Sequence, residues 1–416
     1  MLAIDFGARS IKAVQLSKTG GGYHLENFGI VLTPPDSILY GEIKDVAAVS
    51  QALAKMLRKK RIYERGGIIA ITGQKVIVRE ITTPLMTEKE LAEGIQWEAP
   101  KYVPYDLKES LLDAVKIEEL EEKEGSKMMK VLLVAAPRSL VEQQISVLKN
   151  VRIQPKAVDI VANAQIRAFE NYLSPVSSSE EDGTRIDIIL SIGASTTEIT
   201  LIEGDRLKFT RTILKGGNDI NGAIEKKFNI PFNEAEMLKR KIGLSLSEEQ
   251  TEKAAEIEEI EETEEDLEEA AEEEAAEEKE EKAEEAATEA VLTNKIEKVK
   301  KENAEKEKLE ESLANQKEIA DLINAGVYEI FNEVRKSLNY FKTQYQKVNY
   351  KRIILCGGMA QLPNLGQVLK KQFGITVVIA NPLKGITVNE HEVDINHLDK
   401  YKSALATAIG LAKRER

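Results

Sequence analysis

The chain opens with Leu2-Ala3-Ile4-Asp5-Phe6-Gly7-Ala8-Arg9-Ser10-Ile11-Lys12-Ala13-Val14-Gln15-Leu16, a strand-forming run, a glycine turn and a second run with alternating side chains. The second half of the chain holds a stretch of the same design, Ile188-Ile189-Leu190-Ser191-Ile192-Gly193-Ala194-Ser195-Thr196-Thr197-Glu198-Ile199-Thr200-Leu201-Ile202. Such turns direct backbone N–H groups and hydroxyls at one point, which suits an anion such as phosphate. Two copies predict a duplicated fold that holds a nucleotide from both sides.

Two further glycine pairs belong with these turns. The segment Arg352-Ile353-Ile354-Leu355-Cys356-Gly357-Gly358-Met359-Ala360 reads as a buried strand that ends in paired glycines, which let the main chain approach a flat ligand. The segment Lys215-Gly216-Gly217-Asn218-Asp219-Ile220 opens a helix whose N-terminus favours negative charge. Glu236 and Lys239 follow on one helical face, where they either reach ribose and base or form an ordinary ion pair.

The order of these motifs resembles the actin-like ATPase superfamily, which includes actin, the Hsp70 ATPase domain, sugar kinases and FtsA. The resemblance implies an α/β protein with a duplicated actin-like (RNase H-like) fold that binds ATP or ADP with Mg²⁺. A carboxylate at Asp5 suits the water shell of that ion, and Ser10 and Lys12 can donate to phosphate oxygens. The implied nucleotide-binding residues are Asp5, Gly7, Ser10, Lys12, Gly193, Ser195, Thr196, Thr197, Gly216, Gly217, Glu236, Lys239, Gly357, Gly358 and Met359.

The second turn departs from the superfamily pattern. Catalytically active members carry Asp-x-Gly there, whereas this chain has Ser191-Ile192-Gly193 and therefore no carboxylate. The hydroxyls of Thr196 and Thr197 remain available for phosphate. We therefore expect nucleotide binding without efficient hydrolysis, and we assign no catalytic residue.

An inserted segment narrows the resemblance. Glu93-Gly94-Ile95-Gln96-Trp97-Glu98-Ala99-Pro100-Lys101-Tyr102-Val103-Pro104-Tyr105 resembles the Trp-Glu-Ala-x-x-Tyr-Ile-Pro-Phe motif of the PilM family of type IV pilus assembly proteins. Phe232–Lys239 also resembles the Ala-Glu-x-x-Lys stretch of FtsA-like proteins. The likeness covers about residues 1–245 and 320–416. Tyr102 and Pro104 either serve binding or fix the core of the inserted subdomain, and we expect the core role.

The PilM resemblance implies a cytoplasmic scaffold rather than an enzyme. In that family the N-terminal cytoplasmic tail of PilN, a bitopic inner-membrane protein, binds in a groove between the first and inserted subdomains as an extended peptide. The expected partners are thus a PilN-like tail and pilus motor ATPases, with possible self-association. The alternatives are an actin-fold ATPase or kinase, which needs an aspartate base, and an FtsA-like filament former. The secretion relative GspL usually continues into a transmembrane helix, which this chain does not show.

Composition limits the remaining classes. The net charge of −13 is misleading, because residues 247–290 alone carry 23 acidic and 3 basic side chains and the rest of the chain is +7. That remainder shows no clustering of arginine with aromatic residues, so we do not expect nucleic-acid binding. One cysteine and three histidines exclude a disulfide framework and argue against a zinc site. A core strand at the N-terminus leaves no room for a signal peptide, and no apolar run is long enough to cross a bilayer.

The motifs and composition together predict a division of the chain. We expect an inserted α+β subdomain built as β-α-β-β-α, helices over Ala157–Asn171, Ile319–Tyr345 and Tyr401–Lys413, and an acidic helical hairpin that projects from the body. We read this acidic arm as a solvated insertion more readily than as an interaction surface. The expected ranges are 1–83 (first subdomain), 84–156 (inserted subdomain), 157–185 (return helix and linker), 186–230 (second phosphate turn), 231–318 (with the acidic insertion 247–318), 319–400 (adenosine motif) and 401–416 (terminal helix packed on the first subdomain).

Overall fold

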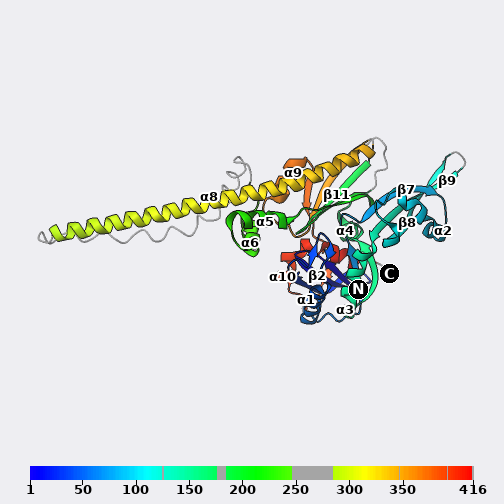
Figure 1. Ribbon diagram of the computed structural model, residues 1–416, viewed down its shortest axis with the longest axis horizontal. Helices are drawn as coiled ribbons and strands as arrows, with labels where there is room; N and C mark the ends of the chain where they lie inside the picture. The colour runs from blue at the N-terminus through cyan, green and yellow to red at the C-terminus, as the bar shows by residue number, and fades with distance from the viewer. Residues whose placement is uncertain (124–125, 176–183, 246–283, 346, 391, 415–416) are drawn as a thin grey trace.

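The computed structural model describes residues 1–123, 126–175, 184–245, 284–345, 347–390 and 392–414, with main chain only for 284–313. Two mixed sheets form two lobes, and a third, antiparallel sheet lies at one end of the molecule (Figure 1). The first sheet has the order β10 (Gln154–Ile160), β6 (Gly66–Ile71), β1 (Leu2–Phe6), β2 (Ser10–Thr19), β3 (Gly22–Leu32) and β16 (Ile386–Val388). The second has the order β13 (Arg206–Ile213), β12 (Thr197–Glu203), β11 (Thr184–Ile192), β14 (Val348–Cys356) and β15 (Thr376–Ile379).

The two large sheets share one topology. In each, three antiparallel strands form a meander (β1–β2–β3 and β11–β12–β13), and two parallel strands then extend the sheet from the first strand of the meander. This repeat confirms the expected duplicated actin-like fold. We call the lobe around the first sheet the first half and the lobe around the second sheet the second half.

Strand alternation gives the first sheet two buried faces. Leu2 and Ile4 point to one face, where α1 (Val46–Lys59) and α3 (Arg138–Asn150) pack, while Ala3 points to the other. That other face is covered by α4 (Val161–Ala168) and α11 (Ala406–Ala412). These two helices cross so closely that a Cβ on Gly410 would overlap a main-chain carbonyl of α4. The first half is therefore closed by residues from the far end of the chain.

The second sheet is covered on one face by α5 (Gly217–Phe228), α6 (Phe232–Ile242), α8 (Glu284–Gln344) and α9 (Leu365–Phe373). Its other face packs against α4 and the first half, in a core that includes Ile189, Ile354 and Phe169. Cys356 is buried there, and burial raises the pKa of its thiol to about 12. The two halves thus share one apolar core beneath the cleft that separates them.

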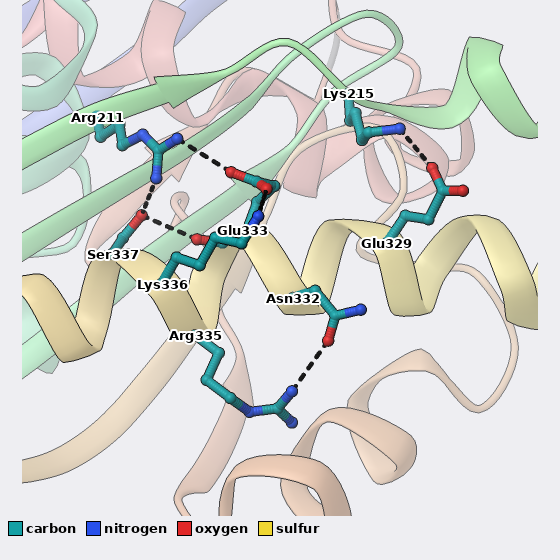
Figure 2. Close-up of polar contacts among 8 residues, drawn as sticks. All are labelled: Arg211, Lys215, Glu329, Asn332, Glu333, Arg335, Lys336 and Ser337. Atoms are coloured by element: carbon teal, nitrogen blue, oxygen red, sulfur yellow. Dashed lines mark hydrogen bonds and ion pairs between the residues drawn. The ribbon is translucent and has the colours of Figure 1, made fainter.

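The helix α8 runs through the second half and continues well beyond it (Figure 1). Its 61 residues correspond to about 90 Å. Figure 2 shows how its second part is fixed: Arg211 of β13 donates to Ser337 at 3.0 Å and pairs with Glu333, and Lys215 pairs with Glu329. The predicted helix Ile319–Tyr345 is therefore too short at its beginning. The other arm and tip of the predicted acidic hairpin lie outside the described residues.

The inserted subdomain is a sheet of order β7 (Ile77–Pro84), β9 (Ser126–Pro137) and β8 (Ser110–Lys123), covered on one face by α2 (Glu88–Glu98). Thr87 and Glu90 form a capping box at the start of α2. Short 3₁₀ turns at Ala99–Lys101 and Leu107–Glu109 lead from α2 into β8. The last helix of the expected unit, α3, instead packs beside α1 on the first sheet.

Two other predicted helices are wrong in part. Within Ala157–Asn171, the first residues belong to strand β10, because parallel pairing with β6 outweighs local helix propensity; only α4 and a 3₁₀ turn at Glu170–Tyr172 are helical. The predicted helix Tyr401–Lys413 is broken into α10 (Ile395–Tyr401), a 3₁₀ turn at Lys402–Leu405 and α11. This break points the carbonyl of Ser403 at the N–H of Gly357, which donates to it at 2.9 Å.

Candidate functional site: a cleft between two glycine turns

The first turn, between β1 and β2, carries an ion pair. Asp5 and Lys12 lie directly opposite each other in the hairpin, and the Lys12 ammonium donates to the Asp5 carboxylate at 2.8 Å. The N–H of Gly7 donates to the carbonyl of Ser10 at 3.2 Å, which closes the turn, and a Cβ on Gly7 would lie 3.0 Å from the Lys12 nitrogen. A side chain at position 7 would therefore crowd the Lys12 ammonium and the Ser10 carbonyl.

The second turn repeats this geometry without the ion pair. The N–H of Gly193 donates to the carbonyl of Thr196 at 2.9 Å. Ser195 is buried, whereas Thr196 is half-buried. The hydroxyl of Thr197 is fully buried and donates to the carbonyl of Lys215 at 2.9 Å, so it supports the turn from below. Of the two threonines, Thr196 is the one open to a ligand.

Helix α5 begins against this turn. The N–H groups of Gly217 and Asn218 donate to the carbonyls of Gly193 and Ala194 at 3.0 and 2.7 Å. A Cβ on Gly216 would lie 2.6 Å from the Ala194 carbonyl oxygen, so a side chain there would separate the helix from the turn. Both predicted glycines of this motif are therefore needed for the packing of α5 on the second turn.

A buried ion pair from α6 lies behind the start of α5. The Lys239 ammonium donates to the Glu236 carboxylate at 2.8 Å and to the Gly217 carbonyl at 2.9 Å, and Asn221 donates to Glu236 at 2.6 Å. Burial opposes ionisation of Glu236, but the charge and hydrogen bond of Lys239, with the bond from Asn221, outweigh it and lower the pKa of this carboxyl to about 2. Glu236 and Lys239 therefore form the ion pair that was one of the two alternatives, but the pair is buried and does not lie on the surface.

The Gly357–Met359 motif also packs against the second turn. Gly357 has φ +91°, and a Cβ there would lie 2.5 Å from the Ile192 carbonyl oxygen, so the strand end of β14 lies directly against the second turn. The N–H of Met359 donates to that carbonyl at 3.0 Å, and its sulfur would be 2.7 Å from a Cβ on Gly217. The structure therefore brings together every predicted site residue of the second half.

Three residues at the cleft escaped the sequence analysis. Arg240 donates to Glu236 at 2.6 Å and lies 3.5 Å from the Gly358 carbonyl; its place directly after Lys239 was an available signal. Arg9, within the first turn, reaches Asn233 of α6 in the other half. Glu198, on β12, is the third and occupies the register position of Lys12.

Glu198 joins the two halves. It lies opposite Ser191 in the β11–β12 hairpin, just as Lys12 lies opposite Asp5 in the first. Its carboxylate accepts hydrogen bonds from the hydroxyls of Thr72, which follows β6 in the first half, and of Thr210 and Thr212 on β13. Burial raises the pKa of Glu198 despite these bonds. The second turn therefore does have a carboxyl group beside it, although not at the Asp-x-Gly position.

These residues fit a nucleotide. The partial positive charge at the N-terminus of α5 and the ammonium of Lys12 suit phosphates, whereas the N–H groups of Gly7, Gly193, Gly217 and Asn218 already donate within the protein. Glu236, Lys239 and Met359 are buried behind the start of α5, so they fix that helix in place rather than present a surface to a ligand. Asp5 is the single carboxylate of the first turn, which suits a hydrated Mg²⁺ held mainly by phosphates. Among the described residues there is no group of three or more His, Cys, Asp or Glu that would hold a metal by protein ligands alone.

A second concave feature lies on the other side of Thr72. A cavity of about 290 Å³, here called the interlobe groove, lies between the first half and the start of α3. Its floor and walls come from the short hairpin of β4 (Ile38–Leu39) and β5 (Glu42–Ile43), from the loop between β6 and β7, from the β9–α3 junction and from the end of β13. The lining residues are Leu39, Tyr40, Glu42, Lys44, Thr72, Gly73, Gln74, Lys75, Pro137, Ser139, Leu140, Gln143 and Leu214.

The structure corrects the expectation for the inserted motif. Tyr102 and Pro104 are exposed, whereas Val103 is buried and Tyr105 packs against the core of the inserted subdomain. The Tyr105 hydroxyl donates at 2.7 Å to the carbonyl of Lys75, a residue of the interlobe groove. The core role expected for Tyr102 and Pro104 is therefore wrong. Val103 and Tyr105 have this role instead, because successive residues of the segment point alternately toward the core and toward solvent.

Comparison with known proteins gives a consistent result. A model of the family described as type IV pilus assembly protein PilM matches residues 3–254 and 246–416. Among solved structures, the PilM-PilN type IV pilus biogenesis complex matches with a TM-score of 0.72 and 23% identity, over 99% of this chain and 97% of that chain. Ethanolamine utilization protein EutJ from Carboxydothermus hydrogenoformans (TM-score 0.46, 13% identity, 99% and 88% covered) and MreB 5 of Spiroplasma citri bound to AMPPNP (0.43, 12%, 98% and 93%) also match.

Proposed function

The chain belongs to the PilM family of type IV pilus assembly proteins, and we propose that it is an ATP-binding scaffold of the pilus inner-membrane platform that docks the N-terminal cytoplasmic tail of a PilN-like protein. Two features support the proposal: a cleft with two phosphate turns and a separate groove that reaches the inserted subdomain. None of the described helices is long and apolar enough to cross a membrane. In this proposal the membrane partner recruits the chain to the inner membrane from the cytoplasm.

The single observation that carries the nucleotide part is the convergence of the glycine motifs. A Cβ on Gly216 would lie 2.6 Å from the Ala194 carbonyl oxygen, and a Cβ on Gly357 would lie 2.5 Å from the Ile192 carbonyl oxygen. These contacts bring the second turn, the start of α5 and the end of β14 together, and Lys12 belongs to the corresponding turn of the first half. We propose that ATP or ADP lies there with Mg²⁺ near Asp5, and that the bound nucleotide holds the two halves at a fixed separation.

The interlobe groove is the proposed docking site for the tail. Its apolar residues include Leu39, Leu140 and Leu214, and its polar residues Glu42 and Lys75 lie within 3.8 Å of each other at the rim. A groove of this kind takes an extended peptide whose apolar side chains fill the floor. The solved relative is a complex of PilM with PilN, which is why we assign this occupant.

Titration of a fluorescent peptide from the cytoplasmic N-terminus of a PilN-like protein tests the proposal, with and without Mg-ATP and alongside phosphate release. We expect saturable binding with negligible phosphate release. Leu39→Asp introduces a charge into the groove and is expected to weaken the peptide at least tenfold, whereas Leu32→Asp, an exposed leucine outside the groove, serves as control. Steady ATP turnover without peptide binding would instead assign the chain to the enzyme class.

A further inference from the structure

The positively charged side chains near the two glycine turns differ in whether a carboxylate already pairs with them. Lys12 donates to Asp5 at 2.8 Å, Lys239 donates to Glu236 at 2.8 Å, and Arg240 donates to the same Glu236 at 2.6 Å. Each of these charges has a carboxylate partner in contact. A phosphate that approaches any of them must compete with an ion pair that is already formed.

Arg9 is the exception. Its guanidinium lies 3.5 Å from the amide oxygen of Asn233, and within the described residues it contacts no carboxylate. An amide oxygen at this distance is a weak partner that leaves most of the five guanidinium donors unused. Arg9 therefore brings an uncompensated positive charge to a turn whose backbone already suits an anion.

The position of Arg9 also places this charge in the cleft. The residue belongs to the first turn, between Gly7 and Ser10, and its side chain crosses to α6 in the second half. Burial is the main cause that lowers the pKa of Lys239, and the positive charges of Arg240 and Arg9 lower it further. The guanidinium is thus close enough to act electrostatically on the buried pair behind the second turn.

We infer that Arg9 is the principal side-chain contact for the terminal phosphates of the bound nucleotide, while Lys12 mainly holds Asp5 and the turn in place. This inference rests on the proposed nucleotide site. A planar guanidinium matches two phosphate oxygens at once, and Arg9 exchanges its amide contact for them when a polyphosphate enters. The residue therefore favours nucleotides by the number of their phosphates, and its exchange of partners breaks the contact with Asn233 across the cleft.

Affinities of the full-length protein for ATP, ADP, AMP and adenosine test the inference, by competition with a fluorescent ATP analogue. For Arg9→Gln we expect ATP affinity to fall at least tenfold, ADP less, and adenosine less than twofold, with a weaker dependence of ATP binding on salt. Arg9→Lys is expected to keep part of the preference for ATP. Arg58→Gln, an exposed arginine of α1, is the matched control and should behave as wild type. A thermal melt of each variant checks that it is folded.

The outcomes separate the two proposals. If the wild-type protein binds ATP and Arg9→Gln binds it equally well, or loses affinity for ATP and adenosine alike, the role of Arg9 is overturned while the nucleotide site stands. If the wild-type protein binds no nucleotide, the proposed function fails in its nucleotide part, and the role of Arg9 fails with it.

Discussion

The two glycine turns have the same backbone and opposite chemistry. In the first, the residues that face each other across the hairpin are Asp5 and Lys12, a pair that borders the cleft. In the second, the same positions hold Ser191 and Glu198, and the carboxyl of Glu198 is buried among threonines of both halves. One turn presents charge to a ligand, while the other uses its polar group to join the lobes.

This difference indicates that the two copies of the turn have different roles. The first turn has an ion pair and the arginine of the turn itself, so in our proposal it is the side that recognises anions. The second turn is held by α5 and β14, which pack on it from two directions, so it is the side that fixes geometry. The predictions below test this division, from the largest expected effect to the smallest.

Among these substitutions, Gly357→Ala should destabilise the protein most, through its contact with the second turn. The new Cβ would lie 2.5 Å from the Ile192 carbonyl at a residue with φ +91°, so it adds a clash to backbone strain. We expect the free energy of unfolding to fall by about 2–3 kcal/mol, and nucleotide affinity to fall with it. The control is Gly374→Ala, which has φ +66° but open space around its Cβ, and chemical denaturation measures both. Equal losses would show that the contact with Ile192 contributes nothing.

Lys12→Ala should damage the first turn. The change leaves the half-buried carboxylate of Asp5 without its partner beside the phosphates, so charge repulsion replaces attraction. We expect ATP affinity to fall at least tenfold, about 1.4 kcal/mol, as measured with a fluorescent ATP analogue. Lys59→Ala, on the exposed side of α1, is the control. Unchanged affinity would remove Lys12 from the site.

Glu198→Gln should change how stability depends on pH. Since burial raises the pKa of Glu198 in the folded state, the folded protein holds this proton at pH values where the unfolded chain has lost it. The contribution is complete below the unfolded pKa near 4.5 and is lost as pH rises toward the folded pKa. We expect the variant to lack this decline, so that its free energy of unfolding increases relative to wild type as the pH rises from 5 to 8. If chemical denaturation showed the same pH dependence of the free energy of unfolding for variant and wild type, protonation of Glu198 would not contribute to stability.

Ser191→Asp makes the second turn resemble the first and should have the smallest effect. The new carboxylate occupies the register position of Asp5, where active members of the superfamily carry an acid. We expect phosphate release from Mg-ATP to increase by no more than tenfold, with Ser191→Asn as the uncharged control. No increase in phosphate release over that control would mean that the missing aspartate is not what limits hydrolysis.

The fold was predictable where local pattern and packing agree. The alternating residues around Gly7 and Gly193 predict both hairpins, and the glycine pair Gly216–Gly217 predicts the start of α5, although the contacts that exclude a side chain at Gly216 come from the second turn. The strand β10 was not predictable, since Ala157–Ile160 becomes extended through pairing with β6. The break before α11 likewise depends on Gly357, a residue distant in sequence.

The candidate site shows the same limit. Glycines and short polar motifs identified the walls of the cleft from sequence. The side chains that cross from one half to the other, Arg9 to Asn233 and Glu198 to Thr72, could not be found, because their partners lie more than a hundred residues away and no local pattern marks them. The exposure of Tyr102 and Pro104 was missed for another reason: residues 102–105 of the motif have no regular secondary structure, so their inward and outward positions depend on tertiary packing.

The closure of the first sheet by residues 386–412 has a consequence for biosynthesis. Strand β16 pairs with β3, and α11 packs on β1 and α4, so the first lobe is complete only after residues 386–412 have been synthesised. The inserted subdomain, whose sheet is contiguous within 77–137, can fold before that point, whereas the first lobe exposes an unpaired edge and apolar surface until those residues are available. A chaperone or the ribosome surface is thus expected to protect this edge during synthesis.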